Sequence, residues 1–458
     1  MDQPVFTPPP PAEPVLIPAE AYISEAYARA ENEKLWAKVW QWACRVEEIP
    51  KVGDFVTYDI LDESIIVTRA SKDEIRAYYN VCQHRGRRLT AGKGCTKRFH
   101  CPFHGWQWNL DGTNARVVDK HDWNGQLTDD RLALRPVKVD IWGGYVFINM
   151  DPDCEPLHDY LEPAKSMLDP FEIDRMRFRW RKATVMPCNW KTALEAFNES
   201  YHLQTSHPQL LEWSDDLHWS KAWGKHSNSG MMPFPANRFA GQGSKRIKPE
   251  PLEDVREALA VNQQHLVDTL DAFLSHSMVE AAQRLPKELP EGTPPLEVLQ
   301  KMVEWTIEID AKKGVTWPAI TPQHMLDAGY DWHIFPNCLI LAAPTYVLGY
   351  RTRPNGYDPD SCIFEAYAMD RVPEGTEPPQ PEIEWSMDLT DERFWGLILM
   401  QDIHNMPEVQ RGMKSRGFVG ARPNPVWEQA VSNFHKTLAD YMGTGAPVVE
   451  PVGETPAG

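Results

Sequence analysis

The sequence predicts an α+β protein in which a small antiparallel β domain precedes a larger domain with an antiparallel sheet covered by helices. The chain has 458 residues, of which 42% are hydrophobic, which is too long for one small domain and enough for more than one core. Period-two apolar patterns dominate residues 53–150, whereas strands and longer helical patterns alternate afterwards. We therefore expect an N-terminal tail and helix at 1–35, a small domain at 36–165 and a large domain at 166–458.

The small domain is predicted from short apolar alternations separated by polar loops. Residues 1–15 are rich in proline and are expected to be extended, and residues 24–40 carry a helical repeat. The following runs alternate as half-buried strands do. They are 55–60, 64–68, 75–81, 106–110 and 135–150, the last divided by Gly143-Gly144.

The large domain is predicted from a different mixture of patterns. Strand-like runs occur at 175–188, 332–348 and 362–369. Asn189 is expected to cap a helix over 190–201. Further helices are expected at 392–415 and 427–442. Residues 213–330 read as a helical insertion, with helices at 251–284 and 294–312 separated by the breakers Pro286, Pro290, Pro294 and Pro295.

Composition excludes several classes of protein. The formal net charge of −18 argues against nucleic-acid binding, which needs clustered Lys and Arg. No apolar run approaches the roughly 18 residues of a membrane helix, and the N-terminus lacks a secretory signal pattern. Eight cysteines in a chain of this length are not a disulfide framework. We therefore expect a cytoplasmic protein with reduced thiols and no membrane partner.

Two short loops in the small domain carry the clearest chemical pattern. Cys82 and His84 form Cys-x-His, residues 85–100 separate them from the second pair, and Cys101 and His104 form Cys-x-x-His. Each loop thus offers one thiolate and one imidazole. This order fits a Rieske [2Fe–2S] cluster, in which two Cys hold one iron and two His hold the other.

A structural zinc site is the competing interpretation. Zinc knuckles usually supply like ligands from each loop, as Cys-x2–4-Cys followed by His-x3–5-His. Here each loop supplies unlike ligands, and a glycine follows each pair, at Gly86 and Gly105. The pattern therefore favours the Rieske cluster over zinc.

These loops, C-x-H-R-G and C-P-F-H-G-W, resemble those of the Rieske non-haem iron oxygenases, the aromatic ring-hydroxylating oxygenase α subunits. The resemblance covers most of residues 36–212 and about 330–412. It implies that 36–165 is a Rieske domain and that 166–458 is a catalytic domain with a mononuclear Fe(II).

A second segment with candidate metal ligands begins at the predicted helix after Asn189. His202 and His207 lie inside N-W-K-x3-E-x-F-x-E-x-Y-H-x4-H, which resembles the iron-binding segment of these α subunits. A lone His-x4-His would be weak, because two unrelated histidines often have this spacing. The resemblance implies that both are iron ligands, completed by a distant carboxylate into two His and one acid on one face. The stretch Q-D-I-H-N-M assigns that carboxylate to Asp402, with a capping role for Asp402 and ligation by His404 as alternatives.

Glu199 has a different predicted role. In the family, the acid three residues before the first His bridges the Rieske His of a neighbouring subunit to an iron-bound His. Many aromatic dioxygenases have Asp there, whereas the E-x-Y-H form found here resembles relatives that act on quaternary ammonium compounds. The resemblance implies a bridge from Glu199 with His104 as the cluster partner. The alternative is a surface acid paired with Lys191 or solvent.

The resemblance also implies the partners and the reaction. A bridge between subunits implies a homotrimer of α subunits, with or without a separate β subunit. No dinucleotide fingerprint follows a strand, so electrons from NAD(P)H are expected through a separate ferredoxin or flavin reductase. The expected activity is that of a terminal oxygenase component that hydroxylates or dihydroxylates an aromatic small molecule with O2.

Two other activities remain open at this point. One is a mono-oxygenase or demethylase that acts on an O-methyl, N-methyl or quaternary ammonium substrate, and the other is a non-enzymatic Rieske electron carrier. The substrate pocket is only weakly predicted from sequence. Its candidate lining residues are Phe197, Asn198, Leu203, Phe335 and Asn337.

Overall fold

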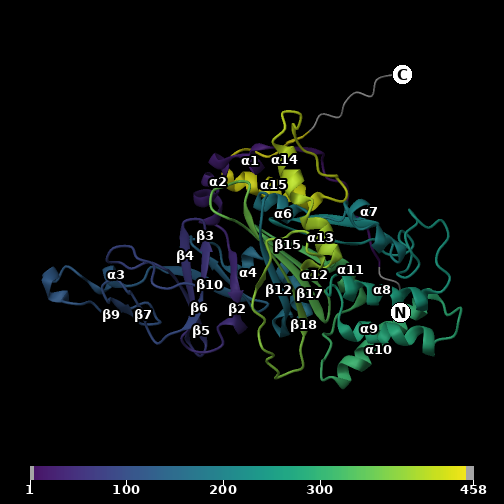
Figure 1. The fold of residues 1–458 in the computed structure, drawn as a ribbon, viewed down its shortest axis with the longest axis horizontal. Helices are drawn as coiled ribbons and strands as arrows, with labels where there is room; N and C mark the ends of the chain where they lie inside the picture. The colour runs from purple at the N-terminus through teal and green to yellow at the C-terminus, as the bar shows by residue number, and fades with distance from the viewer. Residues whose placement is uncertain (1–4, 450–458) are drawn as a thin grey trace. The chain divides into compact units, whose positions relative to one another are not determined.

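The structure is a computed structural model that describes residues 5–449. Contacts divide the chain into two compact units (Figure 1). The smaller unit holds residues 28–162 together with 354–357, and the larger unit holds the remaining described residues. The domain boundaries predicted from sequence, after residues 35 and 165, stay predictions. The prediction of an α+β fold built on antiparallel sheets is confirmed.

The smaller unit is built on a seven-stranded antiparallel sheet with the order β2-β11-β10-β5-β4-β3-β6. The period-two runs form these strands because alternate side chains enter the core. The strands are β2 (Gln41–Arg45), β3 (Asp54–Ile60), β4 (Glu63–Ser71), β5 (Glu74–Tyr79), β6 (Lys93–Cys95), β10 (Pro136–Trp142) and β11 (Tyr145–Asn149). Gly143 and Gly144 turn the chain between β10 and β11, both with positive φ, as the sequence predicts.

A second sheet of the smaller unit has three strands and holds the second ligand loop between its first two strands, whereas the first ligand loop follows β5. The three strands are β7 (Phe99–His100), β8 (Gln107–Trp108) and β9 (Asn114–Arg116). Trp106, Trp108 and Phe99 are buried with Cys82 and Cys101 in one apolar cluster. Packed aromatic rings therefore hold the two cysteines in place. Short helices flank this unit at α3 (Asp129–Leu132) and α4 (Leu157–Tyr160).

The helix expected over 24–40 is divided in the structure. It appears as α2 (Glu25–Glu31) followed by a π-helical turn at Asn32–Trp36. Leu35 and Trp36 in that turn are fully buried, so packing of these two side chains accompanies the change of helical pitch.

The larger unit is built on an eight-stranded sheet with the order β13-β14-β15-β16-β17-β18-β12-β19. Strands β13 to β17 pair antiparallel in chain order, β12 pairs antiparallel with β18, and β19 joins β12 in parallel. Their bounds are β12 (Met176–Met186), β13 (His218–Trp223), β14 (His226–Met231), β15 (Asp331–Ile334), β16 (Cys338–Ala342), β17 (Tyr346–Pro354), β18 (Cys362–Arg371) and β19 (Glu384–Trp385).

The segment predicted as a helical insertion, 213–330, differs from the prediction in three ways. The single helix expected over 251–284 is divided, because one helix ends at Thr269 and the next begins at His276. The beginning of the segment contributes β13 and β14 to the main sheet, so only the later part is helical. Pro286 does not separate helices, because it lies in the last turn of α9, where its missing N–H removes a single backbone hydrogen bond close to the helix end. The helices are α8 (Val255–Thr269), α9 (His276–Glu288), α10 (Pro295–Lys312) and α11 (Pro322–Ala328). Figure 1 shows α8, α9 and α10 together, and they share one apolar cluster.

The remaining helices of the larger unit lie against its sheet. Helix α15 packs on β13 and β14, and α6 packs on β18. The helices are α1 (Glu20–Ile23), α5 (Ala164–Leu168), α6 (Trp190–Glu195), α7 (Leu203–Ser206), α12 (Glu392–Trp395), α13 (Leu397–Ile403), α14 (Met406–Met413) and α15 (Gln429–Met442). A small sheet joins β1 (Val15–Pro18) to β20 (Gly420–Ala421) and β21 (Val448–Val449). No helix among residues 5–449 is both long and apolar enough to cross a bilayer.

The helix predicted over 190–201 is shorter than expected and ends at Glu195. Asn189 does cap its start, because its side chain accepts a hydrogen bond from the Lys191 N–H. Beyond the end, the Glu199 carboxylate accepts hydrogen bonds from the backbone N–H groups of Tyr201 and His202. At the helix end itself the N–H groups of Phe197 and Asn198 bond to the carbonyls of Leu194 and Glu195, three residues back, so the α-helical pattern gives way to a tighter turn. The Glu199 carboxylate then organises the turn that leads to His202.

Candidate functional site

The two loops of the smaller unit have the same backbone geometry. In each, the glycine N–H donates to the carbonyl of the cysteine four residues earlier, from Gly86 to Cys82 and from Gly105 to Cys101, both at 3.0 Å. The φ angles of these glycines are +75° and +73°, a region that other residues rarely adopt. The sequence repeat C-x1–2-H-x0–1-G therefore folds twice into one local structure.

The side chains of these loops converge on one point. Cys82 and Cys101 are buried, with free thiols. The His84 and His104 rings lie 4.6 Å apart between centroids, and His84 stacks on Trp106 at 4.9 Å. Burial raises the pKa of the Cys82 thiol above its ordinary value, so a thiolate there requires a compensating positive charge.

The donor atoms fit a bound metal cluster. Nδ1 of His84 and Nδ1 of His104 are both buried, and neither has a hydrogen-bond partner among the described residues. A buried polar atom without a partner costs free energy, so two of them beside two free thiols fit a site that binds a metal cluster. Two imidazole nitrogens and two sulfurs are the donor set of a Rieske [2Fe–2S] cluster.

A second group of donors lies in the larger unit. Ligand atoms of His202, His207 and Asp402 all lie within 4.8 Å of one another. Asp402 Oδ1 is 2.8 Å from Nε2 of His207 and 3.6 Å from Nε2 of His202. The two histidines flank the short helix α7, and Asp402 comes from α13, so one metal ion could bind all three.

A hydrogen bond at Nδ1 fixes the orientation of each imidazole. His202 Nδ1 lies 2.5 Å from Glu199 Oε1, and His207 Nδ1 lies 2.8 Å from Gln401 Oε1. Both partners are oxygen acceptors, so each Nδ1 carries a proton and each Nε2 faces Asp402. Hydrogen bonds of this kind hold metal-binding histidines in the required tautomer.

The charge of this group also suits a cation. Burial lowers the pKa of His202, but the hydrogen bond to Glu199 and the charges of Glu199 and Asp402 raise it to about 9. The same negative charges that favour a proton on His202 would favour a divalent metal ion in its place, with release of that proton.

A cavity of about 220 Å³ opens beside these donors. It lies between one face of the eight-stranded sheet and the segments that carry His202, His207 and Asp402. Most of its walls are apolar, which is typical of a small-molecule site with a few placed polar groups. The lining residues include Phe197, Leu203, Leu266, Leu270, Phe273, Leu341, Leu348 and Ile398.

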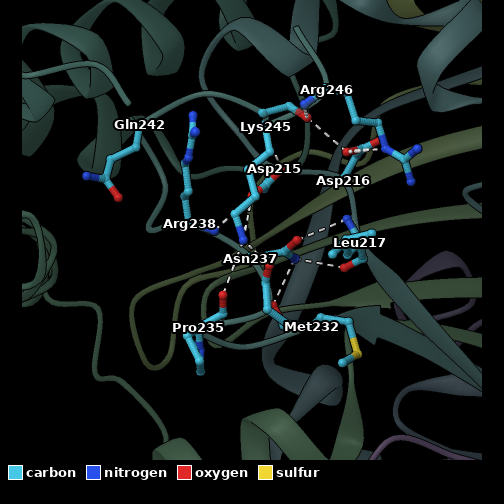
Figure 2. Close-up of polar contacts among 12 residues, drawn as sticks. Asp215, Asp216, Leu217, Met232, Pro235, Asn237, Arg238, Gln242, Lys245 and Arg246 are labelled. Carbon is cyan, nitrogen blue, oxygen red and sulfur yellow. Dashed lines mark hydrogen bonds and ion pairs between the residues drawn. The ribbon is translucent and has the colours of Figure 1, made fainter. Parts of the chain in front are cut away.

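One wall of the cavity is a loop held by internal polar contacts (Figure 2). Asp215 accepts hydrogen bonds from the backbone N–H groups of Arg238 and Lys245, at 2.9 and 3.1 Å. Asp216 accepts from Ser244 Oγ at 3.0 Å and forms an ion pair with Arg246. Both carboxylates are buried and fully engaged, so they fix the wall and are not free to bind a ligand.

Two models of known protein families match the segments that carry these two groups of donors. A model of the ring hydroxylating alpha subunit (catalytic domain) matches residues 173–444, and a model of the Rieske [2Fe-2S] domain matches residues 39–122. The first match alone covers more than half of the chain. The chain belongs to the ring-hydroxylating α-subunit family. The predicted family, and the prediction of a [2Fe–2S] cluster and a mononuclear iron, are confirmed by these two domains.

Several curated relatives of this α-subunit chain match over part of their length. It is 33% identical to the carnitine monooxygenase oxygenase subunit of Escherichia coli (strain K12), over 46% of this chain and 57% of the relative. It is 28% identical to the glycine betaine monooxygenase oxygenase subunit of Pseudomonas aeruginosa (strain UCBPP-PA14), over 43% and 47%. It is 30% identical to the biphenyl 2,3-dioxygenase subunit alpha of Rhodococcus jostii (strain RHA1), over 49% and 53%. The matches span about half the length of these relatives.

Solved structures share the fold over nearly the whole α-subunit chain. A quaternary ammonium Rieske monooxygenase in complex with L-carnitine has a TM-score of 0.62 and 20% identity, over 93% of this chain and 96% of the other. Naphthalene 1,2-dioxygenase with indole bound has a TM-score of 0.62 and 16% identity, over 94% and 93%. The shared architecture is therefore common to both kinds of enzyme.

The structure brings the predicted residues of the α subunit together as two groups. Cys82, His84, Cys101 and His104 converge in one unit, and Glu199, His202, His207 and Asp402 converge in the other. The rival ligand His404 is exposed, and Lys191 is buried beside the ring of Trp190.

The cavity lining was predicted less well. Phe197 and Leu203 line it, but Asn198, Phe335 and Asn337 are not among its lining residues. Sequence reasoning missed Asp331, Tyr330 and His218, which do line it. They lie in or beside strands and belong to no local motif. Only the pairing of β13 to β17 brings them to one face.

Proposed function

We propose that this chain is the terminal oxygenase component of a multicomponent Rieske oxygenase. The observation that carries the proposal is the buried group His202, His207 and Asp402 beside an apolar cavity in a chain of this family. Such a component uses O2, two electrons and two protons to insert one oxygen atom with release of water, or both oxygen atoms into an aromatic ring.

In this proposal Cys82 and Cys101 hold one iron of the cluster, and His84 and His104 hold the other through Nδ1. The unpartnered Nδ1 atoms of both histidines support this assignment. The cluster would accept single electrons from a separate ferredoxin or flavin reductase that oxidises NAD(P)H. Trp106 stacks on His84 and would keep that imidazole in place.

We assign a mononuclear Fe(II) to Nε2 of His202, Nε2 of His207 and the Asp402 carboxylate. Two His and one acid on one face leave open positions, and iron bound there supplies the activation of O2. The protein's own contributions are the fixed tautomers from Glu199 and Gln401 and the apolar walls that exclude water.

Glu199 is proposed to connect the two metal centres between subunits. Its Oε1 already contacts His202, and the proposal places its carboxylate next to His104 of a neighbouring copy. This arrangement needs a head-to-tail ring, so we propose a homotrimer, with or without a β subunit. The expected compartment is the cytoplasm.

The substrate class favoured by the comparisons is an N-methyl or quaternary ammonium compound, oxidised by a mono-oxygenase or demethylase reaction. The support is the E-x-Y-H form at Glu199 and the carnitine and glycine betaine relatives. Aromatic hydroxylation or dihydroxylation is the second candidate, supported by the biphenyl 2,3-dioxygenase relative.

Oxygen uptake and product mass test this function. The iron-loaded protein is combined with a ferredoxin, its reductase and NADH, and is offered N-methyl and quaternary ammonium compounds in one panel and aromatic compounds in the other. We expect substrate-dependent oxygen uptake with loss of a methyl group or gain of oxygen. Uptake that is equal with and without every compound, with no product, would contradict an oxygenase.

A further inference from the structure

Asp331 is a buried acid whose charge is not matched by the protein. It begins β15 and lines the cavity beside the proposed iron site, with a relative exposure of 6%. Its Oδ1 is buried and has no hydrogen-bond partner among the described residues. An unpartnered buried carboxyl group costs free energy, so it is retained only where something compensates for that cost.

The other aspartates of the cavity wall differ from Asp331 in this respect, because Asp402 contacts His207 and the remaining two are held by internal contacts. Asp215 and Asp216 engage backbone N–H groups, a hydroxyl and Arg246 (Figure 2). Of the described lining residues, none is Lys or Arg. Asp331 therefore has no Lys or Arg partner among the described residues that line the cavity.

The surroundings of Asp331 are apolar and aromatic. Leu341 lies opposite it on β16, and Tyr330, Phe273 and Tyr350 line the same cavity, with the Phe273 and Tyr330 rings 5.6 Å apart. Such a space accepts methyl groups, and aromatic faces attract cations. Burial raises the pKa of Tyr350, and the charges of Asp402 and Asp331 raise it further, which places that phenol within electrostatic reach of both carboxylates.

We propose that Asp331 is the specificity-determining residue that binds the positively charged nitrogen of an organic ammonium substrate in this cavity. The inference rests on the proposed function, because it takes the cavity beside the iron donors as the substrate site. The cation would supply the charge that the wall lacks, while the leucines and aromatic rings contact its methyl groups. Burial and the charge of Glu199 raise the pKa of Asp331, which agrees with a carboxyl group that lacks a counter-ion until a ligand arrives.

Calorimetric titration of the anaerobic, iron-loaded protein tests this proposal with two pairs of probes of equal shape. The first pair is choline and 3,3-dimethylbutan-1-ol, and the second is benzyltrimethylammonium and neopentylbenzene. In each pair, a quaternary nitrogen is replaced by a neutral carbon. We expect at least one cation to bind at least about tenfold more tightly than its neutral isostere. In Asp331→Asn that preference should shrink to about threefold or less.

Asp310→Asn is the matched control. Asp310 is equally buried in the same unit, but it accepts a hydrogen bond from Trp317 Nε1 at 2.6 Å and does not line the cavity. This variant should keep the preference for the cation. In the absence of ligand, Asp331→Asn should unfold at the same or a higher temperature, because it removes an unpaired buried acid.

A cation preference that survives in Asp331→Asn, no preference in the wild-type protein, or failure of both cations to bind would overturn the proposal. A lower unfolding temperature for Asp331→Asn would also count against it, since it would indicate a structural role. The two proposals fail separately. Turnover of a neutral aromatic compound that is unchanged in Asp331→Asn would support the oxygenase activity and overturn the role of Asp331 in binding a cation. Cation binding that depends on Asp331, without any substrate-dependent oxygen uptake, would do the reverse.

Discussion

Glu199 Oε1 lies 2.5 Å from His202 Nδ1, so one acid holds one imidazole with its Nε2 directed toward Asp402. The same carboxylate accepts a hydrogen bond from the backbone N–H of His202 in the turn beyond the helix that ends at Glu195. The Glu199 side chain therefore sets the tautomer and the ring orientation of His202, and it also holds the backbone at that residue.

Asp402→Ala should remove the mononuclear iron and leave the Rieske cluster intact. Without the carboxylate, two neutral imidazoles offer no charge to Fe(II), and iron per chain should fall from about three atoms to about two. Metal analysis with the visible Rieske spectrum measures both quantities. His404→Ala, which removes an exposed neighbour in the same segment, is the control and should keep all the iron. Full iron content in Asp402→Ala would refute this ligand.

Glu199→Gln should keep both metal centres but slow the passage of electrons between them. The amide retains the shape of the side chain but loses its charge, and changes of this kind beside metal ligands typically cost about 10–100-fold. Stopped-flow reoxidation of the reduced cluster with O2 measures the rate. A rate equal to that of the wild-type protein would exclude the bridging role, whatever the iron content.

Cys101→Ser should abolish the Rieske absorption. A serine oxygen does not replace a thiolate to iron in the buried position of Cys101. Cys95→Ser is the control, because Cys95 is an exposed free thiol of the same unit. A Rieske spectrum that persists in Cys101→Ser, or disappears in Cys95→Ser, would mean that the cluster is held by other residues.

Glu365→Gln should destabilise the larger unit above about pH 4.3, the ordinary pKa of an unfolded glutamate. Burial would raise the pKa of Glu365, but Arg351, Arg353 and Arg181 lower it to about 2. A lowered folded pKa gives stability that is present above the unfolded pKa and is lost as pH falls toward about 2.

The expected loss for Glu365→Gln at neutral pH is about 3–5 kcal/mol, because the buried carboxylate that offsets the charge of Arg351 and Arg353 is removed. Chemical denaturation at several pH values measures it. The difference between variant and wild type should narrow below about pH 4.3. A difference that stays constant down to the acid limit would show that the ion pairs are not its source.

Much of the fold follows from local sequence signals. The hairpin at Gly143-Gly144, the cap at Asn189 and the two ligand loops depend on residues close together in the chain, so their patterns are readable. The chemical segment around His202 and His207 is also local, and the family resemblance added Asp402.

Other features depend on contacts that no local pattern encodes. The helix after Asn189 ends at Glu195, and Glu199 holds the turn beyond it through the N–H of Tyr201, which propensity alone does not predict. Strands β13 and β14 are stabilised by pairing with each other and with β15 across a long gap in sequence. Asp331 has no motif around it, and only the assembled sheet places it in the cavity.

The most direct test of the central claim is electron paramagnetic resonance of the anaerobic, iron-loaded protein after addition of nitric oxide. An Fe(II) bound by His202, His207 and Asp402 has open positions, so we predict a high-spin iron–nitrosyl signal from about one site per chain. Asp402→Ala should lose that signal and retain the signal of the reduced Rieske cluster. Absence of the nitrosyl signal from the iron-loaded wild-type protein, or an equal signal in Asp402→Ala, would contradict a mononuclear iron centre at these residues.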